Sequence, residues 1–197
     1  MIPDLRLTPE QLLQWRDDGF VRLGRILDAE VLEACREDED RLRAGTDLER
    51  ETRSVSTLFW GLILRQCPGA RRLATTGPHL GAVESILGPN VALWYNQFVT
   101  KLPDGDAVRG EFAWHQDNGY VDVSPGTNLT IWVALDDVDT VNGCVWVMPG
   151  SHRAGLLPHR KPREDVWHLQ VPAQGDGTCR CRRRATAWPR RSRPARR

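Results

Sequence analysis

The sequence predicts a mainly β domain with an α-helical flank on its N-terminal side. Helix-capping signals fill residues 1–88, whereas short segments rich in Val, Trp, Thr and Phe fill residues 89–177, with Pro, Gly, Asp and Asn between them. Short strands without intervening helices are typical of an antiparallel sandwich or barrel, and the helices are expected to pack on its outside. The length of 197 residues fits one such domain over residues 1–177, followed by a tail.

The expected helices cover residues 9–18, the stretch between Asp28 and Gly45, residues 58–66 and residues 80–87. At the first of them, Thr8 is the predicted cap, Pro9 occupies the first helical position and Gln11 completes a capping box. Asp28 caps the second helix in the same way. Pro68 is expected to close the third helix, and Gly88 the fourth.

The expected strands cover residues 91–102, 111–115, 128–135, 144–148 and 166–171.

The last twenty residues, 178–197, follow a different pattern, with nine arginines, no acidic residue and no apolar periodicity. They predict an irregular, Arg-rich tail that packs on no core. A polycationic tail can bind nucleic acid or anionic membrane, but an Arg, Ala and Pro mixture is also what GC-rich coding DNA yields out of frame, and we favour the second interpretation.

The charge distribution argues against a nucleic-acid-binding role for the body of the protein. The sequence has 27 basic and 26 acidic residues, and without the nine tail arginines 18 basic residues remain, a net charge of −8. An acidic body lacks the basic face that binds phosphates.

No apolar run is long enough to span a membrane, no secretory signal is recognisable, and the five cysteines form no disulfide or zinc pattern. We therefore expect a cytoplasmic protein.

The sequence His115-Gln116-Asp117 ends a predicted strand and is a candidate metal site. An imidazole and a carboxylate two residues apart can converge where the chain turns out of a sheet, which gives two of the three ligands of a facial triad. That triad holds ferrous iron and leaves positions open for oxygen and a substrate. The spacing alone is weak, because a His and an Asp can equally be satisfied within a loop.

Three blocks extend this motif: EFAWHQDNGY at residues 111–120, LTIWVALDD at 129–137 and NGCVWVMPGSHR at 142–153. In order and spacing they closely resemble the phytanoyl-CoA dioxygenase (PhyH) family of iron(II)- and 2-oxoglutarate-dependent oxygenases. The resemblance covers roughly residues 8–177. It implies a double-stranded β-helix (a jelly-roll, cupin-like fold) and a reaction that consumes 2-oxoglutarate and O2.

The resemblance assigns roles to four residues. His115 and Asp117 match the first two iron(II) ligands of the family, and Gln97 and Trp132 match positions that line its 2-oxoglutarate pocket. Trp132 would supply a wall and Gln97 an amide donor to a carboxylate. The alternatives are a plain core residue for Trp132 and a solvated strand residue for Gln97.

The sequence departs from the family pattern near its end. The pair Gly175-Asp176 matches the entry to the strand that carries the second iron-binding His of the family, but no His follows it. The family also has an Arg some ten residues after that His, which binds 2-oxoglutarate, and the arginines that follow here have no matching context. His152 and His159 match positions near the substrate entrance, and we interpret both as surface residues rather than as the third ligand. The expected fold is therefore incomplete at its C-terminus, as if the chain were truncated or frame-shifted after about residue 177.

These patterns predict an enzyme that hydroxylates a small organic metabolite, which would be its small-molecule partner. The resemblance implies hydroxylation rather than halogenation, because halogenating relatives carry a small residue at the position of Asp117. The alternative is a catalytically impaired member of the family or a non-catalytic binding protein. A nucleic-acid binder that acts through its Arg tail is disfavoured by the acidic body. The sequence leaves the substrate and the oligomeric state open.

Overall fold

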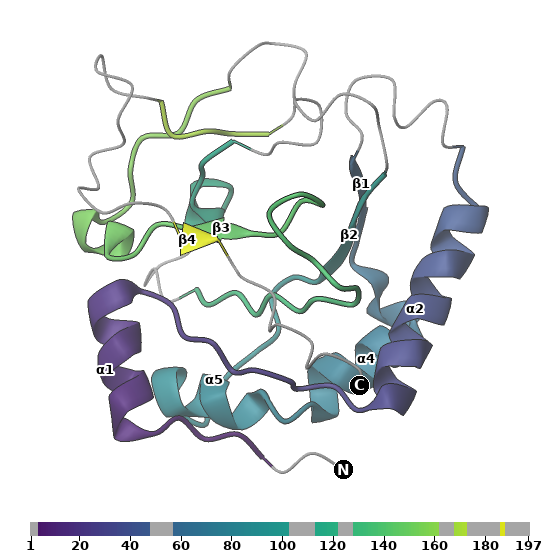
Figure 1. The fold of residues 1–197 in the computed structure, drawn as a ribbon, viewed down its shortest axis with the longest axis horizontal. Helices are drawn as coiled ribbons and strands as arrows, with labels where there is room; N and C mark the ends of the chain where they lie inside the picture. Colours follow the sequence, from purple (N-terminus) through teal and green to yellow (C-terminus); the bar gives the residue numbers. More distant parts are fainter. Residues whose placement is uncertain are drawn as a thin grey trace, which may run out of the picture. The chain divides into compact units, whose positions relative to one another are not determined.

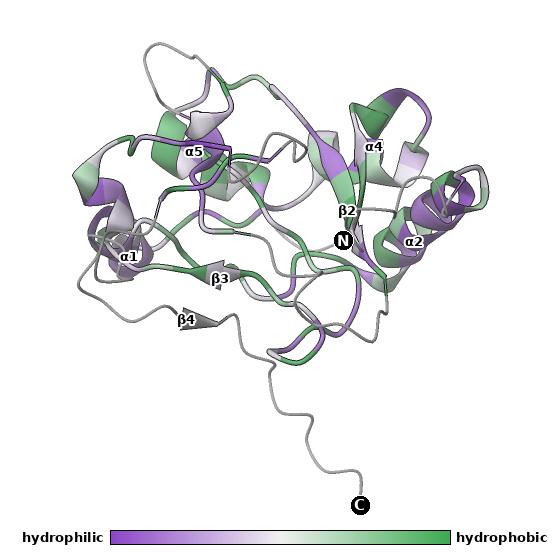
Figure 2. Ribbon diagram, turned by 90° about the horizontal axis from the view of Figure 1, so that it is seen from above, coloured by the Kyte–Doolittle hydropathy of each residue, from purple (hydrophilic) through white to green (hydrophobic). Residues whose placement is uncertain are grey.

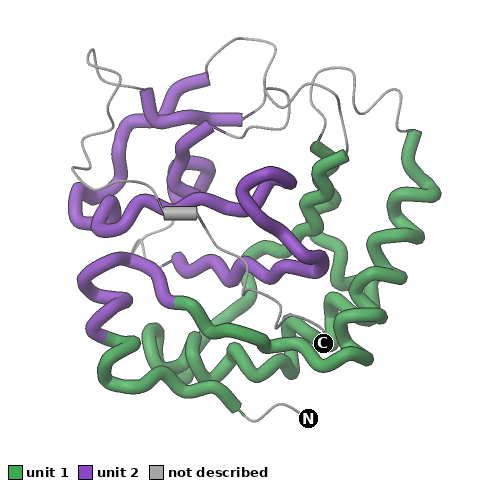
Figure 3. The backbone as a smooth tube through the Cα atoms, viewed as in Figure 1, with its two compact units in different colours: residues 1–12, 22–111 green, residues 13–21, 112–197 purple. Residues whose placement is uncertain are grey.

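A computed structural model describes residues 4–47, 57–102, 113–121, 128–161 and 168–172, together with the backbone of residues 186–187. The chain forms two compact units (Figure 3). Unit 1 comprises Met1–Leu12 and Arg22–Glu111, and unit 2 comprises Leu13–Val21 and Phe112–Arg197.

Along the chain (Figure 1) the elements are α1 (Pro9–Asp18), α2 (Ala29–Ala44), β1 (Thr57–Gly61), η1 (Ile63–Arg65), α4 (Pro68–Thr76), α5 (Leu80–Leu87), β2 (Gln97–Lys101), η2 (Asp117–Gly119), β3 (Trp146–Val147), η3 (Ser151–Ala154) and β4 (Thr186–Ala187). The η elements are short 3₁₀ helices. Among the described residues, no helix has both the length and the apolar character that a membrane crossing requires.

Three of the predicted helices are confirmed, and their ends are set by local contacts. At the start of α1, the Thr8 N–H donates to Gln11 Oε1 at 2.9 Å and the Gln11 N–H donates to Thr8 Oγ1 at 3.3 Å, which is the predicted capping box. Asp28 Oδ1 accepts from the Val31 N–H at 2.9 Å and caps α2. Helix α5 ends at Gly88, whose φ of +83° is a backbone conformation that favours glycine.

The predicted helix over residues 58–66 is wrong. Its first part is strand β1, which pairs antiparallel with β2 so that Trp60 lies opposite Phe98. Leu62, with a φ of +54°, ends the strand. The next N–H, that of Ile63, donates to the side chain of Asn96 at 2.8 Å. A short apolar run is compatible with either helix or strand, and here the pairing with β2 decides between them.

Pro68 begins a helix instead of closing one. It occupies the first turn of α4, where a missing N–H costs nothing. The N–H of Ala70 in that turn donates to Oδ2 of Asp38, an almost fully buried residue of α2, at 2.9 Å. A side chain of one helix therefore satisfies the N-terminus of the other. Figure 1 shows the two helices side by side.

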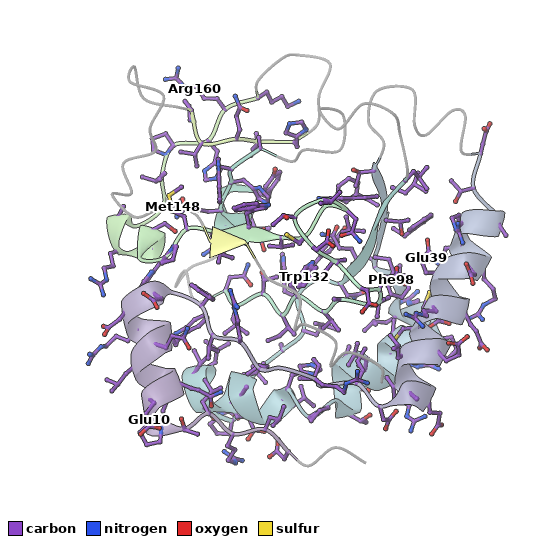
Figure 4. The ribbon with its side chains drawn as sticks, in the orientation of Figure 1. Glu10, Glu39, Phe98, Trp132, Met148 and Arg160 are labelled. Carbon is purple, nitrogen blue, oxygen red and sulfur yellow. The ribbon has the colours of Figure 1, made fainter. Side chains whose placement is uncertain are left out.

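The core of unit 1 lies between these helices and the β1–β2 pair. Its buried members and the half-buried side chains around them are Ile63, Cys67, Ala70, Leu42, Trp60, Leu64 and Phe98. Figure 2 shows α2 with hydrophilic and hydrophobic residues along its length, as expected for a helix with one face in a core. Thr100 of β2 also donates to Glu39 of α2 at 2.8 Å. Glu39 and Phe98 are labelled in Figure 4.

Unit 2 is built mainly from extended chain with short ladders. β3 pairs antiparallel with β4, and Arg160 forms an antiparallel bridge with Gln170. The pairing of β4 corrects the prediction that the tail packs on nothing, because the backbone of these two tail residues joins β3. The remainder of the tail and Gly175-Asp176 lie outside the described residues.

The predicted strands are shorter in the structure. Of residues 91–102 only Gln97–Lys101 form a strand, and of residues 144–148 only Trp146–Val147 do. Residues 128–135 belong to no named strand, yet their exposure alternates with a period of two, as in a strand with one buried face. Residues 113–115 and 168–171 are the described parts of the other two predicted strands, and among them Gln170 alone makes a ladder contact. Helices with short antiparallel pairs agree with the predicted class, and the jelly-roll remains a prediction.

Candidate metal centre

His115 and Asp117 converge where the chain turns inside unit 2. Gln116 has extended backbone angles, and the 3₁₀ turn η2 begins at the next residue, closed by the Tyr120 N–H on the Asp117 carbonyl at 3.0 Å. His115 Nε2 consequently lies 3.4 Å from Asp117 Oδ1. The prediction that these two side chains come within about 5 Å of each other, the reach of one shared ion, is confirmed.

A backbone carbonyl sets the tautomer of His115. The ring Nδ1 lies 2.8 Å from the Ala113 carbonyl oxygen. Because a carbonyl only accepts, Nδ1 carries the hydrogen, and the lone pair of the neutral ring is on Nε2, opposite the carboxylate. Two acceptors then face each other across 3.4 Å. Either a proton on the ring or a cation between the two atoms resolves that repulsion.

The electrostatics of the pair follow from this arrangement. Burial lowers the pKa of His115, but the interaction with Asp117 and the bond to Ala113 outweigh it, so the pKa is raised above 6.5. The pKa of Asp117 is lowered, first by the bond with His115 and also by a bond from Thr130, against the effect of burial. The side chains remain 28% and 51% exposed, so an ion from solvent can reach both.

Thr130 is a member of the site that the sequence did not single out. Its Oγ1 donates to Asp117 Oδ2, which leaves Oδ1 toward His115. The signal that could have revealed it is the period of two in residues 128–135, where Thr130 lies two positions before Trp132 and therefore on the same face. The half-buried face carries the apolar residues Leu129, Ile131, Val133 and Leu135.

Trp132 (labelled in Figure 4) belongs to the more exposed face of that segment and is 39% exposed. At this exposure Trp132 is not a buried core residue, which argues against the alternative interpretation of Trp132 as a plain core residue. Gln97 is the first residue of β2 in unit 1, and its side chain is exposed. The structure therefore brings together His115, Asp117 and Thr130 in unit 2, and the cofactor-binding roles of Trp132 and Gln97 stay predictions.

Tyr120 is a second residue that sequence reasoning missed. Its ring lies edge-on to that of His115, with centroids 5.8 Å apart and an interplanar angle of 85°. Its hydroxyl exchanges two hydrogen bonds with the backbone of Leu169. The Val171 N–H also donates to the Trp114 carbonyl at 2.8 Å, so the segment 168–172 runs beside the candidate site.

His152 and His159 are engaged with the backbone. His152 Nε2 lies 3.0 Å from the Arg16 carbonyl, in unit 2. His159 Nδ1 lies 2.7 Å from the Leu157 carbonyl, and its Nε2 accepts from the Gln116 N–H at 2.9 Å. These bonds occupy both ring nitrogens of His159, which gives this histidine a structural role. That neither histidine is the third ligand stays a prediction.

His168 lies on the segment beside the site, and its pKa is lowered by burial and by the charge of His115. Within the described ranges, no three or more His, Cys, Asp or Glu side chains are grouped so that they could hold a metal ion. An imidazole nitrogen and a carboxylate oxygen are nevertheless donors that suit ferrous iron, so the chemistry of the pair fits that ion.

Within the described residues, the structure shows two antiparallel strand pairs, four α-helices and the close approach of His115 to Asp117, and comparison with known proteins supplies the family. The model of the phytanoyl-CoA dioxygenase (PhyH) family matches residues 15–174. The chain therefore belongs to this family, as the three sequence blocks predicted.

Several relatives are named as dioxygenases. The peroxisomal phytanoyl-CoA dioxygenase of Bos taurus is 32% identical over 93 residues, which are 47% of this chain and 28% of that protein. The phytanoyl-CoA dioxygenase of Arabidopsis thaliana is 40% identical over 62 residues, 32% of this chain and 21% of that protein. The chain thus spans less than a third of the length of these relatives.

A longer alignment is found with the phytanoyl-CoA dioxygenase domain-containing protein 1 of Bos taurus. It is 27% identical over 198 residues, covering 76% of this chain and 67% of the relative. No solved structure matches the chain.

Proposed function

We propose that this chain carries an Fe(II)- and 2-oxoglutarate-dependent dioxygenase site that hydroxylates a small organic metabolite, with His115 and Asp117 as iron ligands. The observation that carries the proposal is the approach of His115 Nε2 to Asp117 Oδ1 at 3.4 Å, with Nδ1 of the same ring held by the Ala113 carbonyl. Family membership supports the reaction class.

The residues around the pair prepare it to hold a cation. The Ala113 carbonyl keeps the hydrogen of the His115 ring on Nδ1, so that Nε2 is the donor atom available to a metal. Partial exposure of both side chains lets the ion and its other ligands enter. When bound, ferrous iron would activate O2 and bind the 2-oxoglutarate co-substrate.

The proposal extends to the co-substrate and the fold. Trp132, on the face of its segment that also carries Thr130, would form a wall for 2-oxoglutarate, and the amide of Gln97 would donate to one of its carboxylates. We also propose that residues 89–177 form the double-stranded β-helix of the family. The period of two in residues 128–135 supports an extended segment with one buried face in that fold.

The test measures cation binding and turnover separately. Titration with Co(II) as the probe should show one site that His115→Ala and Asp117→Ala each remove. His152→Ala is the matched control, because that histidine of unit 2 bonds the Arg16 carbonyl and should leave Co(II) binding unchanged. Succinate formation from 2-oxoglutarate, with ferrous iron and ascorbate, reports turnover. Co(II) binding that is equal in wild type and His115→Ala would overturn the proposed site.

The second candidate is a catalytically impaired or non-catalytic member of the family. Both ring nitrogens of His159 bond backbone groups, so this histidine has a structural role. This observation favours the second candidate. A missing ligand lowers metal affinity by at least the ~10 to 100-fold typical of a lost supporting partner. Weak Co(II) binding without succinate would identify this candidate, whereas robust succinate formation would exclude it.

A further inference from the structure

The two oxygens of Asp117 face different neighbours. Oδ1 lies 3.4 Å from His115 Nε2, whereas Oδ2 accepts a hydrogen bond from Thr130 Oγ1. Thr130 comes from the extended segment thirteen residues further along the chain. The carboxylate therefore has one oxygen tied to a hydroxyl and one directed to the partner imidazole.

This arrangement restricts how the carboxylate can bind a cation. The terminal torsion of an Asp side chain is broad, so a free carboxylate can present one oxygen or both. A hydroxyl hydrogen bond to Oδ2 fixes that torsion and uses a lone pair of this oxygen. Binding through Oδ1 alone then leaves more of the ion's positions open to other ligands.

Thr130 lies on the more exposed face of its segment. Its neighbours Leu129 and Ile131 are half-buried on the opposite face. A β-branched side chain has few accessible χ1 rotamers, so the backbone directs the hydroxyl. Thr130 is exposed, which means that its replacement removes a donor without opening a core cavity.

We propose that Thr130 is a positioning residue that commits Asp117 to binding a divalent cation through Oδ1 alone. This inference rests on the proposed function. In this proposal Thr130 acts through Asp117, to which its hydroxyl donates, and is not itself a ligand of the ion.

The test uses three substitutions in the full chain and Co(II) as the probe. Thr130→Val keeps the side-chain shape and removes the hydroxyl, whereas Thr130→Ser keeps the donor. Thr140→Val is the control, because Thr140 is an exposed threonine of the same unit. We expect Thr130→Val to weaken Co(II) binding about 10-fold, within the range for a lost supporting partner, and Thr130→Ser and Thr140→Val to stay near wild type.

The visible absorption of bound Co(II) is the readout that a merely structural role would not move. It depends on coordination number, so release of Oδ2 in Thr130→Val should change the spectrum and Thr130→Ser should restore it. The thermal midpoint of each variant checks folding, and Thr130→Ala repeats the measurement should Thr130→Val fail to fold.

The outcomes separate this inference from the proposed function. If His115→Ala abolishes Co(II) binding but Thr130→Val and Thr130→Ala match wild type in affinity and spectrum, the role of Thr130 is overturned and the metal site stands. If wild type itself binds no Co(II), both are overturned. Loss in Thr130→Val with rescue in Thr130→Ser supports the inference.

Discussion

Tyr120 and Leu169 are joined by two hydrogen bonds across 49 positions of sequence. The Leu169 N–H donates to the Tyr120 hydroxyl at 2.8 Å, and that hydroxyl donates to the Leu169 carbonyl at 3.0 Å. Both polar groups of one backbone residue are thus satisfied by a single side chain, whose ring also lies edge-on to His115. Tyr120 therefore links the segment 168–172 to the candidate site.

Tyr120→Phe should destabilise the protein by ~1 kcal/mol, because it removes two hydrogen bonds to the backbone of Leu169 whose groups water can reach. Urea unfolding measures the change. Tyr95→Phe is the matched control, since Tyr95 is the other tyrosine of the chain and is 49% exposed, and it should stay within ~0.5 kcal/mol of wild type. Equal stabilities for the two variants would contradict the assigned role of the Tyr120 hydroxyl.

Asp38→Ala should destabilise the chain by ~1 to 3 kcal/mol. The substitution leaves the Ala70 N–H in the first turn of α4 without its acceptor and removes the partner of Arg41. Asp40→Ala is the control, because the Asp40 carboxylate is exposed and its pair with Arg43 contributes little. Chemical denaturation of both variants should separate them, and a control loss as large as that of Asp38→Ala would argue against the helix-capping role.

Cys35 should resist alkylation in the folded protein. It is fully buried, and burial together with the neighbouring charge of Asp38 raises its pKa to about 11, so almost no thiolate is present at neutral pH. Treatment with iodoacetamide at pH 8, followed by peptide mass spectrometry, should show Cys35 labelled only after unfolding in urea. Rapid labelling of Cys35 in the native protein would show that the packing of α2 on α4 is wrong.

The His115–Asp117 pair should make metal-free stability depend on pH. The folded pKa of His115 is raised, so its contribution is present below 6.5 and is lost as pH rises through that folded pKa. The folded pKa of Asp117 is lowered, so its contribution is present above 3.8 and is lost as pH falls through the folded value. The pair therefore stabilises the fold most between about pH 4 and 6.5.

Urea unfolding of wild type and Asp117→Asn at pH 5.5 and pH 8 checks this window. The stability difference between the two proteins should be larger at pH 5.5. A difference that grows toward pH 8 would reverse the sign and exclude the ion pair. Cation binding should follow the opposite trend, because protons on His115 compete with the metal, and Co(II) affinity should rise with pH through the pKa of that ring.

Local chemistry in the sequence determined three of the helices. Each helix cap bonds a residue only three positions away, as Thr8 does with Gln11 and Asp28 with Val31. A short stretch of sequence therefore contains both the cap and its partner and predicts where the helix begins. The approach of His115 to Asp117 is local in the same sense, because a turn directly after Gln116 brings the two side chains together. Such contacts need no knowledge of the rest of the chain.

Only the tertiary structure decided the features that depend on distant partners. Residues 57–61 form a strand because β2, some forty positions away, offers backbone groups and Phe98 for Trp60, and an apolar run of this length has no decisive period of its own. Thr130 and Tyr120 acquire their roles from Asp117 and Leu169 in the same way. The sequence around a hydroxyl residue does not reveal its hydrogen-bond acceptor, because the acceptor comes close only when distant segments of the chain pack together.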